Sequence, residues 1–119
     1  MSIKLLPSED KMRSPCPIAN ALDIIGDKWT LLIIRDLLAG KCRYGELESS
    51  PEGIPTNILS SRLKLLLNAG LIDKIIYQTR PPRYEYTLTD RGRELTPLLK
   101  HIEHWGLANI EGTHAYIDI

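Results

Sequence analysis

The spacing of the apolar residues changes twice along the chain, and this pattern limits the folds that the sequence can adopt. In the first part of the chain, apolar residues recur every three or four positions, which is the period of a helix with one buried face. Residues 71–77 are instead rich in β-branched side chains, and in residues 83–88 two tyrosines and a leucine alternate with polar residues. A period of two is typical of a strand. Because the helical period then returns, the sequence predicts one β-hairpin enclosed by helices.

Capping residues and helix breakers mark where the helices end. Pro17 suits the first turn of a helix, and Asp27 can cap a second helix that stops before Gly40. Gly70 stands where a left-handed C-terminal cap is expected. We predict helices over residues 17–25, from the Asp27 cap to residue 38, over 44–49 and 55–68, and a final helix capped by Thr89 with Leu95, Leu98, Leu99, Ile102 and Trp105 on one stripe. The hairpin turn is expected over residues 78–82.

The order helix, helix, short helix, helix, hairpin, helix predicts a mainly α fold with a small β-hairpin, the winged helix-turn-helix. A chain of 119 residues suits one domain, which we expect over residues 16–111, with tails at 1–15 and 112–119. The first fifteen residues lack the apolar core of a signal peptide, and no apolar run approaches the ~20 residues that span a bilayer. We therefore expect a cytoplasmic protein without membrane contact.

The charged residues are balanced overall but unevenly distributed. The formal net charge is zero, yet residues 54–83 contain five basic residues and a single acidic one. Affinity for phosphate depends on local charge, so the middle of the chain is the part suited to nucleic acid.

The predicted helix over residues 55–68 has two contrasting faces. Leu59, Leu63 and Leu66 share its apolar face, as expected for a helix anchored on a core. Small polar side chains and one lysine gather on the opposite face, and such side chains let a helix enter the major groove and bond to bases or phosphates. The alternative is a merely solvated face. The candidate DNA contacts of this helix are Thr56, Asn57, Ser60, Ser61 and Lys64.

Arginines lie on both sides of this helix in the sequence. Arg80 in the hairpin turn, with Arg83 beside it, is placed to contact phosphates or a minor groove, where arginine is favoured. Arg43, before the short third helix, is a further candidate for phosphate contact. Each arginine alone is more often a solubilising charge, but basic residues that flank one polar helix favour DNA binding.

Several motifs occur in the order found in a known regulator family. They are Cys16-Pro17, Gly26-Asp27-Lys28-Trp29, Arg43-Tyr44-Gly45-Glu46-Leu47, Ala69-Gly70-Leu71-Ile72 and the stretch from Pro81 to Thr89. Together they resemble the HxlR branch of the MarR-like regulators. The resemblance implies a homodimer formed by terminal helices, with Leu98, Ile102 and Trp105 as contacts unless they serve the protomer's own core. It also implies binding to a pseudo-palindromic double-stranded DNA operator, usually as a repressor.

The chain departs from the family pattern at the start of the recognition helix. Pro55 stands where a serine is common, which leaves Thr56 as the hydroxyl expected near DNA. Leu65 and Leu67 replace residues that are usually charged, and they either extend the core or cover part of the wing.

Cys16 is the candidate sensing residue. It precedes the first helix, whose unpaired amides and dipole favour thiolate over thiol. Some regulators resembling this chain use a cysteine at this place to sense quinones, aldehydes or oxidants, so a small electrophile or oxidant is a candidate effector. Simple packing near a dimer contact is the other explanation. Cys42 is expected to be structural, although a bond to Cys16 of a partner chain stays open.

Other classes of function find less support in the sequence. There is no phosphate-binding glycine loop and no catalytic serine or zinc-protease motif, so we expect neither an enzyme nor a cofactor. His101 and His104 lie three apart, which could place both on one helix face as metal ligands, but solvated histidines are the commoner case and we expect no metal site. A winged-helix module that binds protein instead of DNA remains the main alternative, because a fold does not dictate function.

Overall fold

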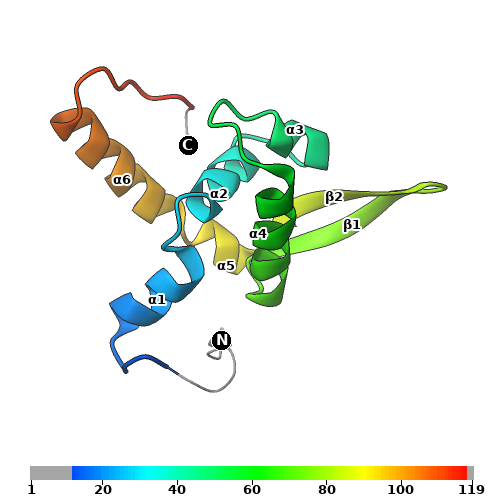
Figure 1. Ribbon diagram of the computed structural model, residues 1–119, viewed down its shortest axis with the longest axis horizontal. Coiled ribbons are helices and arrows are strands. Elements are labelled where there is room, and N and C mark those ends of the chain that lie inside the picture. Colours follow the sequence, from blue (N-terminus) through cyan, green and yellow to red (C-terminus); the bar gives the residue numbers. More distant parts are fainter. Residues whose placement is uncertain (1–11, 118–119) are drawn as a thin grey trace.

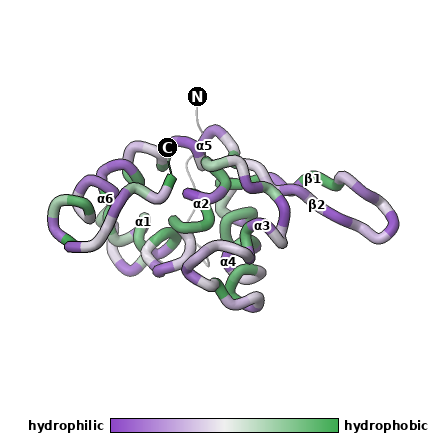
Figure 2. Tube along the Cα trace, turned by 90° about the horizontal axis from the view of Figure 1, so that it is seen from above, coloured by the Kyte–Doolittle hydropathy of each residue, from purple (hydrophilic) through white to green (hydrophobic). Residues whose placement is uncertain are grey.

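The computed structural model describes residues 12–117, which form six helices and one hairpin in this range (Figure 1). The elements are α1 (Pro17–Ile25), α2 (Thr30–Leu38), α3 (Tyr44–Glu48), α4 (Thr56–Asn68), β1 (Ile72–Thr79), β2 (Pro82–Leu88), α5 (Asp90–Arg93) and α6 (Thr96–Asn109). The hairpin of β1 and β2, here called the wing, extends to one side, and α1 and α6 lie at the opposite end of the molecule (Figures 1 and 2). The predicted mainly α fold with one hairpin is confirmed.

The core lies where α2 and α4 meet the base of the hairpin. Ile34, Leu59 and Leu66 are fully buried, and Ile72 at the start of β1 is 1% exposed. Burying a side chain of this size contributes about 1.5–3 kcal/mol, so these residues hold α2, α4 and the base of the hairpin in one core. The buried face predicted for α4 is confirmed by Leu59, Leu63 and Leu66. Leu65 and Leu67 are partly buried against this core, so they extend it.

Local signals fix the helix ends, although α2 begins later than predicted, at Thr30 with Trp29 and not Asp27 as its N-cap residue. The backbone amides of Trp29 and Thr30 both donate to Asp27 at 3.0 Å, which satisfies the open N-terminal turn of α2. Gly70 has φ +74°, the left-handed conformation of a residue that ends a helix. These two residues therefore determine where α2 begins and where α4 gives way to β1.

The final helix differs from the expectation. Thr89 caps only the short α5, through a hydrogen bond from the Gly92 amide, and the chain then bends before α6 begins. The reason is Pro97, which has no N–H to donate to the carbonyl of Arg93 in a continuous helix. The Thr96 hydroxyl donates to that carbonyl instead, at 2.8 Å. The prediction of a single helix from Thr89 onward was wrong.

The hairpin has a tighter turn than the sequence suggests. Its strands pair antiparallel from Ile72 opposite Leu88 to Thr79 opposite Pro82, with one irregularity between Ile76 and Gln78. The predicted turn over residues 78–82 thus narrows to Arg80 and Pro81. Within residues 12–117, no helix combines the length and apolar character needed to cross a bilayer.

Candidate nucleic-acid interface

The outward face of α4 carries polar side chains without partners inside the described range. Asn57, Ser61 and Lys64 are all exposed, on the side of the helix opposite Leu59 and Leu63. Within residues 12–117, their side chains make no hydrogen bond or ion pair. Their donors and acceptors are therefore available to an external ligand, and the small size of Asn57 and Ser61 lets that ligand approach the helix backbone closely.

Two other predicted contacts, Thr56 and Ser60, are engaged by α3. The Thr56 hydroxyl donates to the Glu48 carboxylate at 2.6 Å. The Tyr44 hydroxyl lies 2.9 Å from both the Thr56 carbonyl oxygen and the Ser60 hydroxyl. Both residues are exposed on α4, so they lie on the candidate surface, but their side chains are positioned by the preceding helix.

Arg43 joins the start of α3 to the wing. Its Nε donates to Glu85 at 3.0 Å, and its guanidinium lies 4.0 Å from the centroid of the Tyr77 ring. The hydrogen bond from Arg43 to Glu85 raises the pKa of Arg43, so the group keeps its charge. Because Glu85 already neutralises part of that charge, Arg43 offers less to a phosphate than a free arginine would.

The wing places Arg80 at its tip and Arg83 at the start of β2, both exposed. Neither side chain has a hydrogen-bond or ion-pair partner among the described residues. Lys74 in β1 lies 4.1 Å from the centroid of the Tyr84 ring on the exposed wing. The wing therefore presents cations beyond the edge of the helical body, as Figure 2 shows for its hydrophilic outer end.

The turn that leads into α4 is held by a charged cluster on α2. Arg35 donates two hydrogen bonds of 2.8 Å to the Glu52 carboxylate, a bidentate arrangement that fixes both position and orientation. The same guanidinium bonds to Asp36 at 3.0 Å, and Asp36 accepts a hydrogen bond from Ser50. The hydrogen bonds from Arg35 lower the pKa of Glu52, so the carboxylate stays ionised. The turn cannot shift without breaking this cluster.

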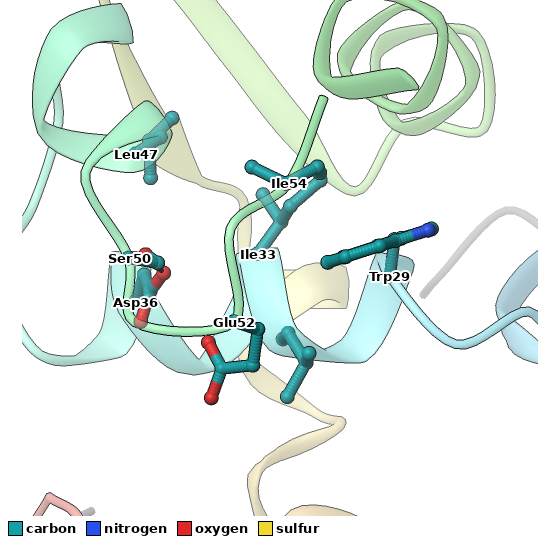
Figure 3. A pocket seen from close by; sticks show the side chains of 8 residues that line it. Trp29, Ile33, Asp36, Leu47, Ser50, Glu52 and Ile54 are labelled. Atoms are coloured by element: carbon teal, nitrogen blue, oxygen red, sulfur yellow. Dashed lines mark hydrogen bonds between the residues drawn. The ribbon is translucent and has the colours of Figure 1, made fainter. Parts of the chain in front are cut away.

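A small pocket lies between α2 and this turn. Figure 3 shows Ser50 and Asp36 facing each other on one side, with Trp29 and Ile54 on another. Its volume of about 10 Å³ leaves room for about one water molecule. This pocket is too small to hold an organic effector.

An apolar surface lies on α6 at the end away from the wing. The exposed fractions of Leu98, Ile102 and Trp105 are 38%, 48% and 64%, whereas Leu99 on the same helix is 8% exposed and faces the core. The apolar stripe predicted for this helix thus divides into two parts: Leu99 packs in the protomer's own core, and Leu98, Ile102 and Trp105 face outward. On α1, Ile18 is also largely exposed. Exposed apolar surface of this kind is typical of a protein interface.

The two cysteines lie in different surroundings. Cys16 is exposed at the N-terminal cap of α1, and its side chain makes no capping hydrogen bond. Cys42 is half-buried beside Glu46 and Glu85, and burial together with these carboxylates raises the pKa of its thiol. Of the two thiols, Cys16 is the more accessible to a reagent.

The sequence did not reveal the residues that position α4 from other elements, which are Arg35, Tyr44 and Glu48. Each bonds to a partner 8 to 17 positions away in the sequence, a separation that no helical or strand period predicts. The adjacent arginine and aspartate on an otherwise apolar α2 were the one available signal, because a charged pair on a buried helix needs a partner. No group of three metal-binding side chains occurs among residues 12–117, where His101 and His104 lie exposed on α6.

Comparison with curated proteins identifies relatives in several bacteria. An HTH-type transcriptional regulator of Mycobacterium tuberculosis is 42% identical over 89 residues, which cover 75% of this chain. The chain spans 56% of the length of that relative. The HTH-type transcriptional regulator YdeP of Bacillus subtilis is 37% identical over 91 residues, covering 76% of this chain and 71% of YdeP.

Solved structures share the fold. The redox regulator HypR in its oxidized form superimposes with a TM-score of 0.73 at 32% identity, covering 81% of this chain and 99% of HypR. The reduced form of the transcriptional regulator YodB from B. subtilis gives a TM-score of 0.67 at 26% identity, covering 85% of this chain and all of YodB. The hairpin is therefore the wing of a winged helix-turn-helix.

The match to a family model covers most of the chain. The model described as HxlR-like helix-turn-helix matches residues 24–114, which include everything from α2 to the end of α6. The relatives matched are transcriptional regulators, not enzymes. The chain belongs to the HxlR-like helix-turn-helix family.

Proposed function

We propose that the chain is a transcriptional regulator that binds a specific DNA sequence through α4 and the wing. The observation that supports this most is the outward face of α4, where Asn57, Ser61 and Lys64 are exposed and unpaired within the described range. These donors and acceptors suit base edges and phosphates in a major groove. Arg80 and Arg83 on the wing would contact the backbone or the adjacent minor groove. Residues 16–111 would form the DNA-binding domain, which acts in the cytoplasm.

We propose further that the active species is a homodimer that represses by occupying a pseudo-palindromic operator. The exposed side chains of Leu98, Ile102 and Trp105 on α6 support a contact at the end away from the wing. A symmetric contact there would leave both recognition helices free. Two helices held by a two-fold axis read half-sites about one helical turn apart, which is why the operator is expected to be pseudo-palindromic.

Modification of Cys16 by an oxidant or electrophile is the proposed signal. The thiol is exposed and lies on the residue before α1. Figure 1 shows α1 and α6 at the same end of the molecule, away from the wing. The similarity to the redox regulator HypR supports the same class of signal. The test is diamide treatment of the DNA complex, with Cys16→Ser as the resistant variant and Cys42→Ser as the control. Release of DNA from both variants alike would contradict the proposal.

The second candidate function is a winged-helix module that binds another protein. The formal net charge of zero is the feature that favours it. The two functions differ in their response to salt, because phosphate contacts release counterions and an apolar protein contact does not.

The experiment is a fluorescence anisotropy titration with DNA from upstream of the gene, at several salt concentrations. Lys64→Ala and Arg80→Ala should each weaken binding and lower the salt slope by about one unit for each phosphate that the protein no longer neutralises. Lys100→Ala on α6 removes the same charge away from the proposed DNA interface, so this variant should bind DNA as the parent does. If no salt-sensitive binding appears, or if all three variants behave alike, the DNA-binding proposal is wrong and protein binding becomes the better account.

A further inference from the structure

We propose that Glu48 is a specificity-determining residue that reads a cytosine in the major groove, and that Thr56 positions it for this role. The inference rests on the proposed DNA-binding function. It concerns a residue of α3, not of the recognition helix itself, and its starting point is the short contact between the two side chains.

Glu48 and Thr56 form an exposed pair at the N-terminal end of α4. The carboxylate Oε2 of Glu48 accepts a hydrogen bond from the Thr56 hydroxyl, with 2.6 Å between the two oxygens, and both residues are exposed. The Thr56 carbonyl accepts a further hydrogen bond from Tyr44, so the first turn of α4 is tied to α3 on two sides. The position of Glu48 relative to the recognition helix is therefore set by the protein before any ligand binds.

The Glu48–Thr56 pair lies at the N-terminal end of α4, the end at which a recognition helix approaches the bases. In helix-turn-helix proteins the N-terminal residues of the recognition helix contact base edges. A side chain bonded to the first residue of α4, Thr56, lies in the same region. Glu48 would thus enter the groove together with Asn57 and Ser61.

The chemistry of a carboxylate restricts what it can contact there. An ionised carboxylate accepts hydrogen bonds and cannot donate them, and it repels phosphate. Within residues 12–117 the second oxygen of Glu48, Oε1, has no hydrogen-bond partner. The donors that bases present in the major groove are the amino groups of cytosine and adenine, and Glu pairs with the cytosine amino group.

The same contact changes the role expected for Thr56. Its hydroxyl proton is directed to Glu48, so it is not available to a phosphate while the pair is intact. Thr56 then acts as a positioning residue through Glu48. A variant that keeps the shape of Thr56 but loses the hydroxyl should affect base discrimination at the Glu48 position alone.

The experiment selects binding sites from a random DNA library with the parent, Glu48→Gln, Thr56→Val and Glu94→Gln. Glutamine pairs with adenine, so Glu48→Gln should move the preference at one position of each half-site from cytosine to adenine, by about fivefold or more. Thr56→Val should reduce discrimination at that position about two- to threefold and leave the other positions unchanged. Glu94 is exposed at the end of α5, so Glu94→Gln removes the same charge elsewhere and should keep the parental site.

Each outcome has a defined meaning. An identical preferred sequence for the parent and Glu48→Gln overturns the inference while leaving the proposed function intact. A change in preference for Glu94→Gln also overturns it, because net charge would then account for the effect. If the parent enriches no sequence, the proposed function fails and the inference fails with it. Thermal melting of all four proteins should give similar midpoints, since the altered side chains are exposed; a large loss for Glu48→Gln would show a structural role instead.

Discussion

Replacing Arg35 with alanine should destabilise the protein strongly, because it leaves a buried carboxylate without its cation. The Asp36 side chain is 4% exposed and that of Arg35 is 12% exposed. Removing one partner of a buried ion pair costs about 3–5 kcal/mol. Ser50 still donates to Asp36, so we expect the lower end, about 3 kcal/mol. For a domain of this size that is a fall in Tm of roughly 12 °C.

Two companion variants separate this cause from a general loss of packing. Glu52 is 34% exposed, so Glu52→Gln removes a more solvated pair and should cost at most about 1 kcal/mol. The double variant Arg35→Ala with Asp36→Asn removes the buried charge itself and should be more stable than Arg35→Ala alone. Urea denaturation followed by circular dichroism gives all three free energies of unfolding. Equal losses for Arg35→Ala and Glu52→Gln, or a double variant less stable than Arg35→Ala, would refute the reasoning.

Three further predictions concern packing, pH and assembly. Gly92→Ala would place a Cβ 2.1 Å from the Leu71 carbonyl oxygen, so it should lower the free energy of unfolding by about 2 kcal/mol or more in the same urea titration. The added Cβ of Gly45→Ala meets nothing within 4 Å, so that control variant should lose far less stability. The pKa of Glu52 lies below its ordinary value of 4.5 in the folded state because Arg35 donates to it. The stability that the ionised Glu52 contributes is therefore present above pH 4.5 and is lost as the pH falls below 4.5. When Tm is measured from pH 7 to 3, it should fall below pH 4.5, and less steeply in Glu52→Gln than in the parent; identical profiles would contradict this. Trp105→Glu should convert the proposed dimer to a monomer in sedimentation analysis, because a charge would enter an apolar contact, and an unchanged mass would exclude Trp105 from the interface.

Local patterns in the sequence were sufficient to predict most of the fold. The limits of α1 and α4, the hydrogen bonds to Asp27 before α2 and the left-handed Gly70 all depend on residues within a few positions of one another. The final helix was predicted wrongly. There the missing donor of Pro97 outweighed a continuous helical spacing, and the chain bends between α5 and α6.

The candidate interface was predictable only in part. The polar face of α4 follows from helical periodicity, and Asn57, Ser61 and Lys64 are exposed as that periodicity requires. The partners of Thr56 and Arg43 were not predictable, since Glu48 and Glu85 approach them only after the helices and the wing have packed. Spacing in a sequence reports which side chains share a face, but it does not report which side chains meet across elements.

Hydroxyl-radical footprinting on a DNA site selected by the parent protein is the most direct test of the central claim, that α4 and the wing of a dimer read a specific operator. We expect two protected segments related by the pseudo-palindrome, with centres about 10 base pairs apart, and with Lys64→Ala we expect both segments to need a higher protein concentration for the same protection. Protection that is uniform along the DNA, confined to one segment, or unchanged in Lys64→Ala would contradict the claim.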